Sequence, residues 1–246
     1  MLHQIWFDLG HGEIPKAPNG IETMKRRSGL QYKLWSYTEA VELIRNEMPN
    51  KINDIWDNLP HGINRADFFR YIILYKFGGI YFDIDFHCLK DLNCFLVNDL
   101  VLLSEEWPFS YKNGSLHNGI LICKTPRHRF WLEVIEEVGK RLQCLKDKSD
   151  MQMSVFKLTG TSMLRDAALR YINDKNIMHN VAVLPYGIFC PLICNDHTYI
   201  DDYELNGKKL SNLRLPDSET AILNARVHTF CSLCPSVKIW QYDFLK

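Results

Sequence analysis

The stretch of sequence that decides the fold reads Asn64-Arg-Ala-Asp67-Phe-Phe-Arg70-Tyr-Ile-Ile-Leu-Tyr-Lys-Phe77-Gly78-Gly79-Ile80-Tyr-Phe-Asp83-Ile-Asp85-Phe-His87. Apolar residues recur at helical spacing through its first half, and a glycine pair then ends the predicted helix. Asn64 is a favourable N-cap residue, and Asp67 follows it three positions later, a spacing similar to a capping box. From Ile80 the apolar period changes to two, which is typical of a buried strand. The stretch therefore predicts a helix that begins at Asn64, a Gly-Gly break and a strand.

Two carboxylates lie at the end of this predicted strand. Asp83 and Asp85 would share one face of it, because residues two apart lie about 6.5 Å apart along a strand. Neighbouring negative charges at the end of an apolar strand repel each other, and a divalent cation, which prefers carboxylate oxygens, relieves that cost. Asp67 and Arg70 share a helical stripe and could reach the same place. A structural alternative is that Asp67 caps the helix and pairs with Arg70, while the two aspartates begin a solvated turn.

The spacing of these residues resembles the sugar-binding region of DXD glycosyltransferases of family thirty-two. That family includes fungal initiating α-mannosyltransferases and capsular-polysaccharide enzymes, with the clostridial glucosylating toxins as more distant relatives. Its members read approximately Ala/Ser-Asp-x-x-Arg-x-x-x-Leu-x-x-x-Gly-Gly-x-Tyr-x-Asp-x-Asp. The matching residues here are Ala66, Asp67, Arg70, Leu74, Gly78, Gly79, Tyr81, Asp83 and Asp85.

The resemblance implies a fold, a reaction and a set of roles. The fold would be an α/β fold of GT-A type, with a mostly parallel central sheet flanked by helices. The reaction would move a hexose from a UDP- or GDP-sugar to a glycan or other hydroxyl acceptor, with retention of anomeric configuration. Asp83 and Asp85 would be the catalytic residues, Asp85 bridging a metal to the donor diphosphate and Asp83 holding the ribose or the sugar. Asp67 and Arg70 would hold sugar hydroxyls, and Arg70 could also reach phosphate.

Two more donor-binding residues follow from the resemblance. The family's opening strand, Ile-His-x-Ile-Trp-x-Gly, corresponds to His3, Ile5 and Trp6, which implies that Trp6 lies near the nucleotide base. The alternative for Trp6 is an ordinary core aromatic. In the family an Asn at the position of Asn118 lines the donor-sugar pocket, and its amide can both donate to and accept from a hydroxyl. The alternative for Asn118 is a turn residue before Gly119.

The metal site would be completed from the far end of the chain. Many family members end in His-x-x-x-x-Ser-Trp, in which the His ligates the metal, and this chain reads His228-Thr-Phe-Cys-Ser232-Leu-Cys234 without the Trp. A structural role for His228 is the alternative. Mn²⁺ suits mixed carboxylate, imidazole and phosphate ligation, with Mg²⁺ second. Another departure is at Thr159-Gly160-Thr161, where the family has Thr-Gly-Pro.

The order of the predicted elements is that of an α/β nucleotide-sugar domain, with ligands at the carboxyl ends of the strands. No repeats or linkers interrupt the sequence, so we expect one domain over residues 1–246. The expected strands are 3–9, 31–37, 80–85, 100–104 and 181–190. The expected helices are 21–27, a helix opened by a Thr38 cap, 52–59, the helix before the Gly-Gly break, 126–144 and 162–172.

Composition excludes several classes of protein. The 246 residues are 46% apolar and 24% charged, with 29 basic and 29 acidic side chains and zero formal net charge. Balanced charge argues against a nucleic-acid-binding surface. Eight cysteines are too few for a disulfide scaffold in a chain of this length, so we expect reduced thiols. The sequence has neither a signal peptide nor a transmembrane segment, which favours a cytoplasmic enzyme or one whose anchor has been removed.

Two other functions compete with glycosyl transfer. The missing Trp and Pro would suit a non-catalytic descendant of the same fold that binds nucleotide sugars or glycans. An Asp-x-Asp after an apolar strand also begins phosphohydrolases in which the first Asp is a nucleophile. In those enzymes the motif ends the chain's first strand and is followed by Thr or Val. Here it begins at residue 83 and reads Asp83-Ile-Asp85-Phe86, which argues against that class.

Overall fold

The computed structural model of the chain describes residues 1–7, 19–88, 90–105, 116–147, 154–174, 180–184 and 189. It also gives the backbone of three short strands, β8 (Glu204–Leu205), β9 (Lys208–Lys209) and β10 (Ser236–Lys238). His228 lies outside the described residues, so its role as a metal ligand stays a prediction.

The centre of the described structure is a six-stranded sheet with the order β2-β1-β3-β6-β5-β7. Strand β1 is parallel to β2 and β3, and β5 is parallel to β7, whereas β6 runs antiparallel to both of its neighbours, β3 and β5. The prediction of a mostly parallel sheet is therefore confirmed. The strands are β1 (Leu2–Ile5), β2 (Tyr32–Trp35), β3 (Gly79–Phe82), β5 (Val101–Glu105), β6 (Leu116–Cys123) and β7 (Val181–Leu184).

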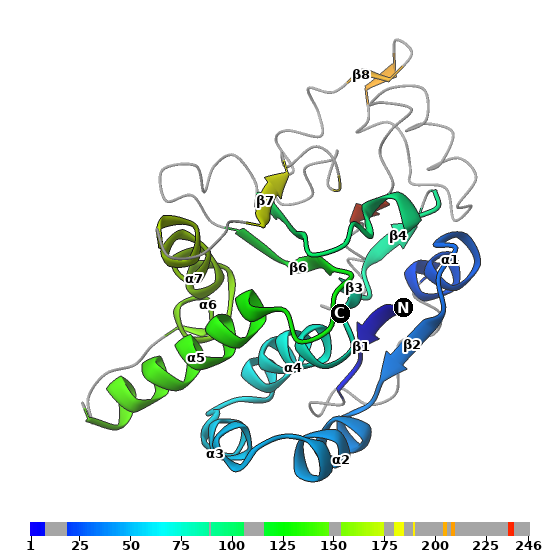
Figure 1. Ribbon diagram of the computed structural model, residues 1–246. Coiled ribbons are helices and arrows are strands. Elements are labelled where there is room, and N and C mark those ends of the chain that lie inside the picture. Colours follow the sequence, from blue (N-terminus) through cyan, green and yellow to red (C-terminus); the bar gives the residue numbers. More distant parts are fainter. Residues whose placement is uncertain are drawn as a thin grey trace.

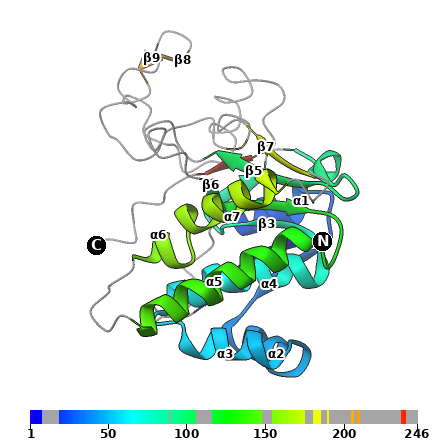
Figure 2. The same ribbon diagram turned by 60° about the vertical axis from the view of Figure 1, so that its left-hand side comes forward.

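Helices cover both faces of this sheet (Figures 1 and 2). Helices α4 and α5 lie side by side against it, and α2 and α3 lie outside them at the edge of the molecule. A small antiparallel pair, β4 (Phe86–Cys88) with β10, lies beside α1. The helices of the described residues are α1 (Asn19–Arg27), α2 (Tyr37–Glu47), α3 (Asn50–Asn58), α4 (Gly62–Phe77), α5 (Arg129–Asp147), α6 (Val155–Leu158) and α7 (Thr161–Asn173), with a 3-10 turn, η1 (Asn93–Phe95).

Strand β3 has apolar contacts on both faces of the sheet. Tyr81 packs into the cluster formed with α2, α3, α4, α5 and α7, while Ile80 and Phe82 pack into a second cluster with Met24 of α1. A strand covered on both faces has no polar face. The alternation read from the sequence therefore separates two buried faces, and the carboxylates can appear only where the strand ends.

The caps of two helices differ from the predictions. Helix α4 begins at Gly62 with His61 as N-cap, so the prediction that Asn64 caps it is wrong. Asn64 is instead inside the helix, and its buried side chain donates to Thr159 Oγ1. Helix α2 is capped by Ser36, which forms a capping box with Glu39, and not by Thr38. In α2 a neighbouring favourable residue is the cap, whereas the N-cap of α4, His61, makes no side-chain cap hydrogen bond.

The Gly-Gly break between α4 and β3 is confirmed. Gly78 is the C-cap of α4 with a φ of 64°, and Gly79 has a φ of 99°. Side-chain-bearing residues rarely adopt this conformation. A Cβ on Gly78 would also lie 2.4 Å from the backbone oxygen of Lys124. The break reverses the chain directly from the helix into β3 and so fixes the distance between α4 and the strand end.

The two aspartates do not share a strand face. Strand β3 ends at Phe82, and residues 84 and 85 form a turn that is closed by a hydrogen bond from Phe86 N to Asp83 O of 3.2 Å. Since the sheet is apolar on both sides, the chain leaves it as soon as it becomes polar. The prediction that the strand continues to Asp85 is wrong, and the turn in the structural alternative is present.

Other predictions concern cysteines and membrane spans. Cys88, Cys94, Cys123 and Cys144, the cysteines that the structure describes, are free thiols, as predicted for them. In the described part of the chain, no helix combines the length and apolarity needed to cross a membrane.

Candidate active site

The candidate site lies at the carboxyl end of β3, where the parallel neighbour β1 also ends. His3 pairs with Tyr81 in the register of β1 and β3, so the residues that follow on the two strands reach the same edge. Gln4 of β1 donates from Nε2 to Asp83 O over 3.0 Å, and Tyr32 of β2 donates to Gln4 Oε1 over 2.9 Å. Three strands thus fix the backbone of Asp83.

Arg70 stands between two carboxylates. Its guanidinium contacts Asp67 Oδ1 at 2.8 Å and Asp83 Oδ1 at 3.1 Å, and it also donates to the backbone oxygen of Asn118 at 2.8 Å. The side chains of Asp67 and Arg70 are 5% and 6% exposed, whereas that of Asp83 is 26% exposed. Asp83 is therefore the most exposed of the three side chains, and Arg70 contacts it from the buried side.

Arg70 remains a cation in this setting. Burial disfavours the cation, but Tyr81, Asp83 and Asp67 outweigh that cost and raise the pKa of Arg70. The guanidinium lies over the Tyr81 ring, 4.8 Å from its centroid, in a cation–π contact. Tyr81 also donates its hydroxyl to Asp83 Oδ1 over 2.7 Å, and burial keeps its own pKa well above the usual range.

Asp67 is a buried carboxylate with hydrogen-bond donors on both oxygens. Asn118 Nδ2 donates to Oδ1 over 3.1 Å, beside Arg70, and Thr159 Oγ1 donates to Oδ2 over 2.9 Å. Burial raises the pKa of Asp67, and Arg70, Thr159 and Asn118 act in the opposite direction. The guanidinium of Arg70 and the amide nitrogen of Asn118 can only donate, so both favour the charged form of Asp67 and oppose the effect of burial.

Asn118 reaches this network from strand β6. It is inside the strand, so its alternative interpretation as a turn residue is wrong. Its amide contacts Asp67 and its backbone oxygen contacts Arg70, which leaves it half-buried at the surface of the network. The next residue must be small, because a Cβ on Gly119 would lie 2.3 Å from Asp83 Oδ2. A glycine therefore lets the Asp83 carboxylate rest against the backbone of β6.

Asp85 lies in the turn after Asp83 and is half-buried. Asp67 and Asp83 place two carboxylates around the one guanidinium of Arg70, and Asp85 adds a third carboxylate in the turn that follows. In kind, these oxygens fit a divalent cation. Within the described ranges, no group of three His, Cys, Asp or Glu side chains is arranged to hold a metal. A metal at Asp85 would thus take its remaining ligands from donor phosphate, water or residues such as His228.

Trp6 is at the same edge of the sheet. It follows directly on β1, its backbone N–H donates to Trp35 O over 2.9 Å, and its side chain is half-buried. Its indole Nε1 is buried and has no hydrogen-bond partner among the described residues. Trp6 belongs to neither of the two described core clusters, so it is not a fully enclosed core aromatic.

Sequence reasoning missed the residues that support the carboxylates. Gln4, Tyr81, Asn64 and Thr159 all contact Asp67, Asp83 or their partners through hydrogen bonds given above. The sequence indicates Tyr81 and Thr159 only as parts of a family pattern and Asn64 only as a cap residue, and it gives none of them a role in the site. A polar residue within an apolar strand, such as Gln4, is the sequence feature that could have indicated such a supporting role, because buried polar side chains are normally hydrogen-bonded.

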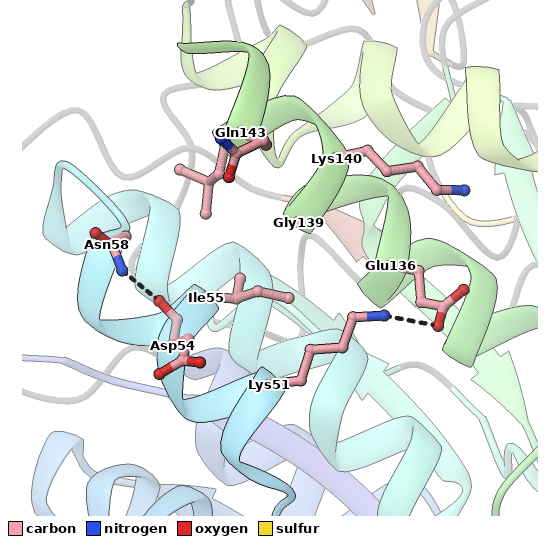
Figure 3. Close-up of a pocket in the computed structure, with 9 residues that line it drawn as sticks. Lys51, Asp54, Ile55, Asn58, Glu136, Gly139, Lys140 and Gln143 are labelled. Carbon is pink, nitrogen blue, oxygen red and sulfur yellow. Dashed lines mark hydrogen bonds and ion pairs between the residues drawn. The ribbon is translucent and has the colours of Figure 1, made fainter. Parts of the chain in front are cut away.

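A separate groove lies between α3 and α5 (Figure 3). It has a volume of about 330 Å³ and an apolar floor that includes Ile55 and Leu142. An ion pair of 3.1 Å between Lys51 and Glu136 crosses its rim. None of its lining residues belongs to the Asp67–Arg70–Asp83 network, so it is not part of the candidate active site.

Comparison with known proteins identifies this region. Residues 21–105 match the family described as "Glycosyltransferase sugar-binding region containing DXD motif". This region of the chain is therefore similar to the sugar-binding region of those glycosyltransferases. It contains Asp67, Arg70, Asp83 and Asp85, whereas Trp6, Asn118 and Thr159 lie outside it. The match is to glycosyltransferases, which contradicts the phosphohydrolase alternative.

Several curated proteins are similar to this chain. Uncharacterized glycosyltransferase L373 of Acanthamoeba polyphaga mimivirus is 26% identical over 207 residues, which are 80% of this chain and 78% of that protein. Inositol phosphoceramide mannosyltransferases 1 and 3 of Schizosaccharomyces pombe are 28% and 35% identical, each over 57% of this chain. The chain spans less than half the length of those two yeast proteins, at 42% and 37%.

A solved structure supports the fold. The PaToxG Glycosyltransferase superposes with a TM-score of 0.52, covering 70% of this chain and 69% of that one, at 16% sequence identity. At this identity the likeness concerns the fold alone. It confirms an α/β fold similar to a GT-A glycosyltransferase, as expected from the sequence.

Proposed function

We propose that the chain is a metal-dependent hexosyltransferase that moves a sugar from a nucleotide-sugar donor to an acceptor hydroxyl. The observation that carries the proposal is the Asp67–Arg70–Asp83 network at the end of β3, inside a region that matches a glycosyltransferase sugar-binding family. A donor has several hydroxyls and two charged phosphates, which suit a cluster of fixed carboxylates, a guanidinium and an amide.

Mannose is the first sugar to consider. Inositol phosphoceramide mannosyltransferases 1 and 3 carry that sugar in their names, and so does the initiation-specific alpha-1,6-mannosyltransferase of Schizosaccharomyces pombe, 27% identical over 74% of this chain. GDP-mannose is therefore our proposed donor, with UDP-hexoses as alternatives. The acceptor would be a hydroxyl of an inositol-containing lipid head group or of a glycan. Transfer would retain the anomeric configuration.

The exposed residues of the site would contact the donor directly. Asp85 would hold the metal, and the metal would neutralise charge on the departing nucleoside diphosphate. Asp83 and Asn118, which are both partly exposed, would bind the ribose or the sugar. Asp67 and Arg70 would bind sugar hydroxyls through their few exposed atoms and fix the other two residues. Trp6 would lie against the nucleotide base.

The metal would be Mn²⁺, with Mg²⁺ second, and His228 would be its second protein ligand. A neutral imidazole binds metal and a protonated one does not. Metal affinity should then fall as the pH drops through the ordinary range of His. Isothermal titration with Mn²⁺ at a series of pH values would show this fall for the wild type and a flatter profile for His228→Ala. Equal profiles would exclude His228 as a ligand.

Donor turnover tests the proposed function without knowledge of the acceptor. Hydrolysis of GDP-mannose and of UDP-hexoses would be followed in Mn²⁺, in Mg²⁺ and in a chelator. We expect one donor to be turned over only with metal. Asp85→Asn should abolish the metal-dependent part, whereas Asp54→Asn, on the exposed surface of α3, should leave it unchanged.

Two results would overturn the proposal. A donor that binds tightly and is neither hydrolysed nor transferred to any offered hydroxyl would indicate a binding module. Turnover that is equal in wild type and Asp85→Asn at every metal concentration would remove the metal from the mechanism.

A further inference from the structure

We propose that Thr159 and Asn64 are positioning residues that set the orientation of Asp67, and through Arg70 that of Asp83, for donor binding. This inference rests on the proposed function. It concerns two residues that are themselves shielded from solvent, since Thr159 is fully buried and Asn64 is 1% exposed.

The direction of the hydrogen bonds is fixed by chemistry. The Asn64 amide nitrogen is a donor only, and it lies 2.9 Å from Thr159 Oγ1. The Thr159 oxygen must therefore accept from Asn64, and the single proton of the hydroxyl is free to point elsewhere. It points to Asp67 Oδ2, 2.9 Å away. Because the Thr159 hydroxyl accepts one hydrogen bond and donates the other, it fixes the position of Asp67 Oδ2.

The hydroxyl itself is anchored by backbone contacts. Tyr71 of α4 donates its phenol hydroxyl to Thr159 O over 2.7 Å. Thr159 N and Gly160 N both donate to Val155 O over 3.0 Å, which closes the corner between α6 and α7. Three side chains of one helix, Asn64, Asp67 and Tyr71, thus bind the same residue of this corner.

The effect reaches Asp83 through Arg70. Because Thr159 occupies Asp67 Oδ2, the other oxygen of Asp67 is left for Arg70 and Asn118. The guanidinium is planar and rigid, so a rotation of the Asp67 carboxylate would move both the Arg70–Asp83 contact and the Asn118 amide. These are the two groups that face the donor.

Kinetics and binding of matched variants test this inference. Thr159→Val keeps the shape and removes the hydroxyl, Thr159→Ser restores it, and Thr161→Val alters a buried threonine two residues away that makes no hydrogen bond to the network. We expect Thr159→Val to lower kcat/KM for the nucleotide sugar by about 10- to 100-fold, since small errors in position have effects of that order. Affinity for the free nucleoside diphosphate should stay within about twofold of wild type, because the change is at the sugar end.

The control variants separate positioning from general damage. Thr159→Ser should recover most of the lost turnover, and Thr161→Val should behave as wild type. If Thr159→Val does not fold, Asn64→Ala replaces it, with the same selective loss for the nucleotide sugar expected. Equal turnover in Thr159→Val and Thr161→Val, or an equal loss of affinity for nucleotide sugar and free diphosphate, would refute the positioning role. A wild-type chain that turns over no donor would instead refute the proposed function.

Discussion

The buried His3 makes a testable prediction about stability and pH. Its side chain is fully buried at the centre of β1, where Nδ1 accepts from the Trp35 indole over 3.2 Å. Nε2 therefore carries the proton and donates to Gly78 O over 2.9 Å. Burial, opposed by the Gly78 hydrogen bond, lowers the pKa of His3 from 6.5 to about 4. The folded protein thus holds a neutral imidazole where an unfolded chain would hold one that titrates normally.

The sign of the effect follows from this difference. As the pH falls below 6.5 the unfolded chain takes up a proton that the folded chain refuses until about pH 4. The contribution of the neutral imidazole is therefore complete above the unfolded pKa and is lost as the pH falls toward the folded one. The pKa difference corresponds to a loss of about 3 kcal/mol in the free energy of unfolding, of which about 2 kcal/mol is gone at pH 5.

Urea unfolding at pH values from 7.5 to 4.5 measures this loss. His3→Gln removes the titrating group, so its free energy of unfolding, although lower near neutrality, should fall less steeply with acid than that of the wild type by about 2 kcal/mol at pH 5. His61→Gln is the matched control, because His61 is exposed and makes no side-chain cap bond. Parallel pH profiles for wild type and His3→Gln would refute the reasoning.

Three further predictions concern the site and its supports. Arg70→Lys keeps the charge but loses the planar guanidinium, so turnover of the nucleotide sugar should fall by about 10- to 100-fold while affinity for the free nucleoside diphosphate barely changes. Steady-state kinetics and calorimetry measure the two effects, and an equal loss of turnover and of diphosphate affinity would contradict this prediction. Gly119→Ala places a Cβ against Asp83 Oδ2, so donor turnover should fall without loss of the fold, and unchanged kinetics would show that the carboxylate can move aside. Thr161→Pro should raise the free energy of unfolding by about 0.5–1 kcal/mol, because Thr161 is the first residue of α7, where proline fits; a lower melting temperature would oppose it.

The last of these predictions explains a departure from the family pattern. The family has Thr-Gly-Pro where this chain has Thr159-Gly160-Thr161. Gly160 is the N-cap of α7, and the third position only begins the helix. The hydroxyl that contacts Asp67 belongs to the first position, which this chain keeps. The missing proline therefore changes the helix start and leaves the site intact.

The sequence was sufficient for the local part of this architecture. Asp67, Arg70 and Asp83 are close in the chain, and one helix, one glycine break and one strand decide their meeting. The prediction that the strand continues to Asp85 is wrong, because the alternating pattern of Ile80, Phe82 and Ile84 runs past the point where the sheet ends. That end depends on what covers the strand, which is a property of distant residues.

The supporting residues could not be predicted in the same way. Asn64 has the chemistry of a cap residue and of a hydrogen-bond donor, and its choice between them depends on Thr159, which lies 95 positions away. Gln4 and Asn118 likewise reach the site from other strands. Pairings over such separations are set by the topology of the sheet, and a single sequence does not specify that topology.

The position of β3 in the sheet has a consequence for synthesis of the chain. Its two neighbours are β1 and β6, and both lie outside the residues 21–105 that match the family. A fragment limited to that region would leave both edges of β3 unpaired, and such edges promote aggregation. During synthesis on the ribosome, β1 and β2 are available early. Strand β3 can be paired on both sides only after Cys123, the last residue of β6, has emerged. Asp67 gains its last hydrogen-bond partner only after Thr159 has emerged. The region that matches the sugar-binding family is therefore not a folding unit by itself.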